Sequence, residues 1–179
     1  KFQSIEIIIC NILNLCAEEN ESNILYNSNN KSNVLGIFSP VNRCGKTTFV
    51  LELSKYLCED KILVINFESF SALMENLEIE EGLNISDLIY FFVKGNGCFD
   101  TKMDAIIRSS NGVDIIPPTK CVEDLKNISG NVWIQFINLI KEVKDYDLII
   151  LDLANLNIDI VDMLDVCDKI FMPTLDDNI

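Results

Sequence analysis

The sequence predicts a doubly wound α/β fold with a mainly parallel sheet and flanking helices. Three observations lead to this prediction. Apolar segments of strand length alternate with segments whose apolar residues recur at helical spacing. Two apolar runs, Lys61–Phe67 and Tyr146–Leu153, are nearly continuous, as expected for parallel strands buried on both faces. A loop at Pro40–Thr48 joins the first apolar run to a helical segment.

The elements follow in order from these patterns. The expected strands are Val34–Ser39, Lys61–Phe67, Gly112–Pro117, Tyr146–Leu153 and Lys169–Pro173. The expected helices are Gln3–Asn20, Gly45–Cys58, Ser69–Asn76, Ser86–Val93, Val122–Lys126, Asn131–Val143 and Ile158–Val166. Ser86 and Asp87 indicate the capped start of one of these helices. Trp133 lies on a helical apolar face, so we expect it in the core.

The chain divides into three parts by composition. Residues 1–20 form a helix that we expect to belong to something other than the core domain. Residues 21–33 are rich in asparagine and serine, which is typical of a linker. Residues 34–179 are long enough for one α/β domain.

Charge and composition exclude several classes of function. The chain has 28 acidic and 14 basic residues and a formal net charge of −14, so we expect no direct contact with nucleic acid or anionic lipid. It contains no histidine, which excludes acid–base catalysis by histidine. No apolar run reaches the roughly 18 residues that a membrane-spanning helix needs, so we expect no membrane span.

The seven cysteines form no C-x-x-C pair and are odd in number. Cys10, Cys58 and Cys167 lie within apolar patterns. We therefore expect buried, reduced thiols in a cytoplasmic protein rather than a disulfide framework or a zinc site.

The loop Pro40–Thr48 has the chemistry of a phosphate-binding P-loop. Gly45 lets the backbone approach a phosphate closely, and Lys46 can reach the β- and γ-phosphates. The Thr47 hydroxyl can ligate Mg²⁺, and the following helix directs its N-terminus at the anion. The residues expected to bind the nucleotide are Asn42, Arg43, Cys44, Gly45, Lys46, Thr47 and Thr48.

Two acidic residues follow expected strands. Asp152 closes the strongest strand and can hold Mg²⁺ beside Thr47. Glu68 follows the second strand, near the expected γ-phosphate, and can orient the attacking water. An ordinary solvated loop carboxylate is an equally good interpretation of Glu68.

This order of P-loop, acidic strand end and Ile-Ile-x-Asp strand resembles the MinD/ParA family of deviant Walker A ATPases, from residue 34 to the C-terminus. The resemblance implies a P-loop NTPase fold, here ending before the family's last elements, with ATP and Mg²⁺ as cofactors. The family's signature lysine, which crosses a nucleotide-sandwich dimer, corresponds to Val41, and Arg43 is the nearby cation. The two aspartates of the family's Asp-x-Asp motif correspond to Asn66 and Glu68 in this chain.

The resemblance implies a slow ATPase and nucleotide-dependent switch in positioning, pilus or secretion assembly, with protein partners and a possible homodimer. Lys46, Glu68 and Arg43 would be the catalytic residues, and Thr47 and Asp152 the metal ligands. The chain also resembles a CpaE-like subset, in which residues 1–20 would be the tail of a receiver-like domain. The alternative function is a non-hydrolysing nucleotide sensor or scaffold. A tyrosine kinase of the same P-loop type is disfavoured because the four tyrosines are scattered.

Overall fold

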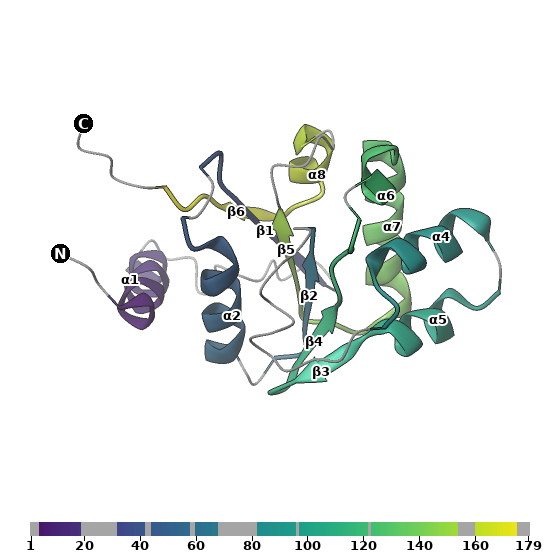
Figure 1. Cartoon of the computed structure of the whole chain (residues 1–179). Coiled ribbons are helices and arrows are strands. Elements are labelled where there is room, and N and C mark those ends of the chain that lie inside the picture. The colour runs from purple at the N-terminus through teal and green to yellow at the C-terminus, as the bar shows by residue number, and fades with distance from the viewer. Residues whose placement is uncertain are drawn as a thin grey trace.

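The computed structural model describes residues 4–18, 32–41, 44–57, 60–67, 82–95, 97–121, 123–153 and 160–174. Its centre is a six-stranded sheet in the order β3-β4-β2-β5-β1-β6 (Figure 1). The strands are β1 (Asn33–Phe38), β2 (Ile62–Asn66), β3 (Arg108–Ser110), β4 (Val113–Ile116), β5 (Leu148–Leu153) and β6 (Lys169–Phe171). They pair in parallel, except that β3 runs antiparallel to β4. The predicted fold class is confirmed.

Helices connect the strands. They are α1 (Ile5–Glu18), α2 (Lys46–Tyr56), α4 (Ile85–Lys94), α5 (Phe99–Ile106), α6 (Glu123–Lys126), α7 (Gly130–Val143) and α8 (Ile160–Asp165). The expected helix Ser69–Asn76 lies outside the described residues. None of the helices in the described part of the chain is long and apolar enough to cross a bilayer.

The five strands predicted from the sequence are present with small changes at their ends, but β3 and α5 were not predicted. β3 joins β4 through Asn111 and Gly112, whose φ angles are 53° and 81°. Positive φ at two successive residues is what a tight hairpin turn of type I′ requires, and Asn-Gly is its preferred sequence. This dipeptide was therefore an available signal for the hairpin.

Helices cover both faces of the sheet (Figure 1). Side chains alternate along the strands, so Ile62 and Val64 of β2 pack with α1 and α2, whereas Leu63 and Ile65 pack with α4, α5, α7 and α8. Trp133 on α7 is fully buried against Phe67, as the sequence predicted for its burial. The result is a three-layer arrangement with one apolar core on each side of the sheet.

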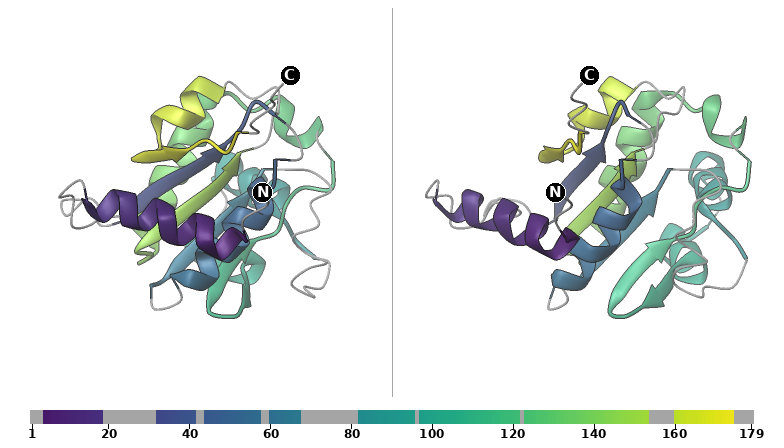
Figure 2. Two further views of the ribbon diagram at one scale, coloured as in Figure 1. Left: turned by 90° about the vertical axis from the view of Figure 1, so that its left-hand side faces the viewer. Right: turned by 60° about the vertical axis from the view of Figure 1, so that its left-hand side comes forward.

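Helix α1 lies next to α2 on the outer side of one layer (Figure 2). Ile9 is only 2% exposed and joins the core cluster beneath α2, and Ile5 and Ile12 pack against the same cluster. The described part of α1 thus completes the α2 side of the core. That residues 1–20 are the tail of a preceding receiver-like domain, and residues 21–33 a linker, stays a prediction.

The start of α4 corrects one detail of the sequence analysis. The N-cap is Asn84 rather than Ser86: the Asn84 side chain accepts a hydrogen bond from the Ser86 backbone N–H at 2.8 Å. The Asp87 carboxylate accepts one from the Asn84 N–H at 2.9 Å. This reciprocal pair is a capping box, which satisfies donors that a helix start leaves open.

The cysteines are less uniformly buried than expected. Cys98 and Cys121 are exposed, while Cys10, Cys44 and Cys167 are half-buried. All five are free thiols, and Cys58 lies outside the described residues. Burial, followed by the charge of Asp168, raises the pKa of Cys167 to about 12. The prediction of buried thiols is thus wrong for Cys98 and Cys121.

Candidate nucleotide site

The candidate site lies where the carboxyl ends of β1, β2 and β5 meet the first turn of α2. In the sheet register, Asn66 of β2 lies opposite Asp152 of β5. Asn66 continues the face of Ile62 and Val64, which pack on the α2 side. Asp152 continues the same face of β5, so both polar side chains project toward the start of α2.

Gly45 forms the turn that starts α2. Its φ is 83°, in the left-handed region that favours glycine, and it occupies the N-cap position. The space around its Cα is open, so the backbone conformation rather than crowding accounts for glycine here. No side chain caps the helix at this position. An uncapped helix N-terminus after a glycine turn is suited to bind an anion.

Lys46 is the first residue of α2 and is only 5% exposed. Within the described residues, no carboxylate forms an ion pair with its ammonium group. Burying an ammonium group without an opposite charge is costly in free energy. A polyanion bound at the α2 N-terminus would supply that charge, so the residues present fit a phosphate group.

Thr47 and Asp152 meet directly. The Thr47 hydroxyl donates a hydrogen bond to Asp152 Oδ2 at 2.8 Å. Asp152 is fully buried, and its backbone carbonyl accepts from the Phe67 N–H at 3.0 Å, which fixes the end of β5 against β2. A hydroxyl and a carboxylate are hard oxygen ligands of the type that Mg²⁺ prefers. The donor set therefore fits this cation.

Asn66 is the residue of this site to which the sequence analysis gave no role. It is fully buried, and its side-chain amide donates to the same Asp152 Oδ2 at 3.2 Å. From the sequence it was interpreted only as a missing acid. Its position at the end of β2 was the available signal. Parallel pairing of β2 with β5 places the ends of the two strands side by side.

The structure brings Thr47 and Asp152 into contact, and Lys46 directly precedes Thr47 at the start of α2. In the rest of the loop, Cys44 is half-buried, while Gly45 and Thr48 are exposed. Asn42, Arg43 and Glu68 lie outside the described residues, so their roles in nucleotide binding and catalysis stay predictions. No group of three acidic or cysteine side chains in the described part of the chain is placed to hold a metal.

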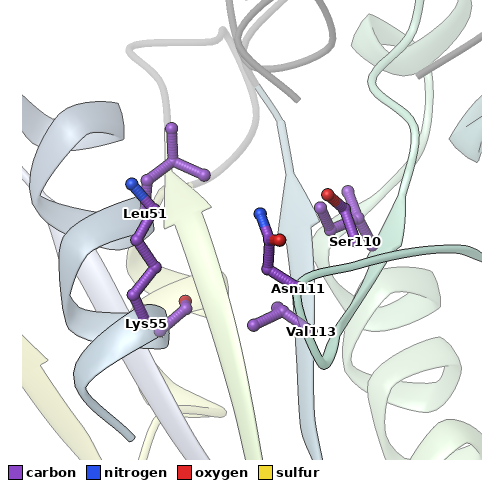
Figure 3. Close-up of a pocket in the computed structure, with 7 residues that line it drawn as sticks. Leu51, Lys55, Ser110, Asn111 and Val113 are labelled. Atoms are coloured by element: carbon purple, nitrogen blue, oxygen red, sulfur yellow. The ribbon is translucent and has the colours of Figure 1, made fainter. Parts of the chain in front are cut away.

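A small pocket lies elsewhere, between the C-terminal half of α2 and the β3–β4 turn (Figure 3). Its lining residues are Leu51, Ser54, Lys55, Ser110, Asn111, Val113 and Ile115. Its polar residues are Ser54, Lys55, Ser110 and Asn111, and no carboxylate or thiol lines it. Because it adjoins the start of β4, it lies at the opposite edge of the sheet from Thr47 and carries no catalytic group.

Comparison with known proteins gives a clear result for the fold. No protein-family model matches the chain, and no curated protein matches it in sequence. Among solved structures, it is similar to a ParA family ATPase from Chlorobium tepidum, with 18% identity and a TM-score of 0.62 over 79% of this chain and 59% of that one.

Two other solved structures are similar to a comparable degree. The septum site-determining protein MinD from Pyrococcus horikoshii, complexed with Mg-ADP, has 18% identity and a TM-score of 0.60 over 80% of this chain and 58% of that one. Cobyrinic acid a,c-diamide synthase from Mycobacterium smegmatis, with bound ADP and magnesium, has 16% identity and a TM-score of 0.61, with coverages of 80% and 60%. The chain thus has the P-loop fold of ParA and MinD and spans less than two thirds of the length of these proteins.

Proposed function

We propose that the chain is a MinD/ParA-like ATPase domain that binds Mg·ATP and acts as a nucleotide-dependent switch. The observation that carries the proposal is the buried Lys46 at the start of α2, followed directly by Thr47, whose hydroxyl donates to Asp152. The bound nucleotides named for the similar MinD and synthase structures support the same ligand chemistry. Because the fold also occurs in a synthase, the process that the switch serves is a further proposal: positioning, pilus or secretion assembly.

Each residue has a role in this proposal. Lys46 and the backbone of the Gly45 turn hold the phosphates, and Thr47 and Asp152 hold Mg²⁺. The metal, when bound, offsets the charge of the phosphate oxygens. Glu68 orients the attacking water, and Arg43 supplies a cation to the charge that develops on the transferred phosphoryl group. A second copy of the chain, meeting the first across the nucleotide, is the proposed assembly.

A specific observation favours a second candidate, a nucleotide sensor or scaffold that does not hydrolyse ATP. Val41 stands where the family has its signature lysine, and Asn66 stands where it has an acid. Such a protein would present a surface to its partners. Tyr90 and Val93 on α4 are 57% and 62% exposed and are the proposed contact.

Nucleotide binding is tested first, by isothermal titration of ATP in the presence of Mg²⁺. Lys46→Ala should weaken ATP binding about 100-fold, because it removes a charge-assisted contact to the phosphates. The matched control is Lys55→Ala on the same helix, whose ammonium pairs with Glu52 at 2.7 Å and should not affect ATP. A Lys46→Ala protein that binds ATP as tightly as the parent would refute the proposed site.

Steady-state phosphate release then separates the two candidates. Turnover that Glu68→Gln abolishes without weakening ATP binding supports the ATPase. Tight ATP binding by the parent with no turnover supports the sensor. A Glu68→Gln protein with unchanged turnover would remove Glu68 from the mechanism and leave the rest of the site standing.

A further inference from the structure

The buried amide of Asn66 contacts the metal-ligand candidate directly. Asn66 and Thr47 both donate to Asp152 Oδ2, at 3.2 and 2.8 Å. Asn66 and Asp152 are each 0% exposed. Two donors that approach one oxygen from different elements, β2 and α2, restrict the rotation of a carboxylate. Asn66 as well as Thr47 therefore restricts the orientation of Asp152.

The charge of the amide matters as much as its geometry. An amide is neutral and can donate, so it stabilises the ionised form of a carboxylate at hydrogen-bond distance. A carboxylate at position 66 would place a second negative charge beside Asp152 in a fully buried position, where like charges repel strongly. Asn66 and Asp152 together therefore carry the negative charge of a single carboxylate.

We propose that Asn66 is a positioning residue for the metal: it holds the Asp152 carboxylate in its ligating orientation and sets the affinity of this edge of the sheet for Mg²⁺. The proposal rests on the Mg·nucleotide function proposed above. It predicts that Asn66 sets the Mg²⁺ concentration at which the nucleotide binds tightly. The contact between the protein and the phosphates depends on Lys46 instead.

Two substitutions at position 66 should have opposite effects. ADP binding is measured by titration in EDTA and then over a series of MgCl₂ concentrations. Asn66→Ala removes the donor, so the Mg²⁺ concentration for half-maximal tightening of ADP should rise roughly tenfold, in keeping with loss of a hydrogen bond to a charged group. Asn66→Asp removes the same donor but adds a negative charge that attracts the cation, so that concentration should fall. Binding of ADP in EDTA should change less than about twofold in Asn66→Ala, which alters no charge.

The matched control is Asn33→Ala. Asn33 is also a buried asparagine of this sheet, 4% exposed, but it lies at the amino end of β1, on the opposite edge from Asp152. It should lower thermal stability without changing the Mg²⁺ dependence. If Asn66→Ala does not fold, as judged by circular dichroism, Asn66→Leu carries the test because it removes the donor and adds no charge while still filling the space of the side chain.

Several outcomes would overturn the proposal. If the variant that removes the donor without adding charge leaves the Mg²⁺ dependence unchanged, Asn66 has only a structural role. If the parent protein binds ADP in the same measurements, the proposed function still stands when the inference about Asn66 fails. A parent that binds no ADP removes the proposed function and this inference together.

Discussion

Asp152 and Asp114 are both strand aspartates that accept two side-chain hydrogen bonds, but their surroundings differ. The Tyr146 hydroxyl donates to Asp114 Oδ2 at 2.8 Å, and the Ser109 hydroxyl donates to Asp114 Oδ1. Each oxygen of this half-buried carboxylate thus has its own donor. At the fully buried Asp152, two donors converge on a single oxygen, next to the buried Lys46 and the start of a helix.

The comparison shows that position in the sheet gives an aspartate its role. Asp114 lies within β4 near an edge of the sheet, where its two hydrogen bonds connect β4 to β3 and to Tyr146, two residues before β5. Asp152 lies near the carboxyl end of a central strand, and ligands of open α/β sheets bind at that end. We therefore expect Asp114 to act on stability and Asp152 to act on nucleotide binding.

The largest expected effect separates the two aspartates directly. Asp152→Asn preserves the shape of the side chain but removes a charged Mg²⁺ ligand, so Mg²⁺-dependent ATP binding should weaken about 100-fold. Asp114→Asn, the same change at the other aspartate, should leave ATP binding unaltered. Isothermal titration of both variants measures this. Equal losses of affinity in the two proteins would contradict the assignment.

A smaller effect is expected from Tyr146→Phe. The tyrosine is 8% exposed, and its hydroxyl is bonded to Asp114. Removing a hydrogen bond to a charged group should lower the free energy of unfolding by about 1.5–3 kcal/mol. Urea denaturation measures the loss. ATP binding should remain that of the parent, and a change in it would show that the two polar clusters are coupled.

The same tyrosine predicts a pH dependence. Burial first, and then the hydrogen bond to Asp114, raises the pKa of the Tyr146 hydroxyl above its ordinary value. The unfolded chain therefore releases this proton at lower pH than the folded one, and the stability due to the neutral hydroxyl is lost as pH rises above about 10. The parent should lose stability in this range more steeply than Tyr146→Phe. Parallel slopes from pH 9 to 11 would argue against the raised pKa.

The smallest effect should come from Ser109→Ala. This hydroxyl is exposed and donates to the other oxygen of Asp114. Because water can replace it, we expect a loss of about 0.5–1 kcal/mol in the free energy of unfolding. A loss larger than that of Tyr146→Phe in the same urea series would reverse the order of importance in this cluster.

The sequence predicted one of these two clusters and missed the other. Gly45, Lys46 and Thr47 are neighbours in the chain, so their chemistry can be recognised without the fold. The bond from Ser109 to Asp114 depends on β3, and a strand of three polar residues is too short to show strand periodicity. Helix α5 was missed for a related reason: it has eight residues, Phe99–Ile106, and its N-cap residue Cys98 makes no side-chain cap hydrogen bond.

By itself the sequence determined the fold class, the glycine turn before α2 and the presence of an aspartate near the end of β5. These features depend on local pattern, on the alternation of buried strands with helices and on the backbone freedom of glycine. Only the tertiary structure decided which side chains Asp152 meets. Asn66 lies 86 residues before it in the chain, and the contact exists because parallel pairing of β2 with β5 sets the two residues level on one face of the sheet.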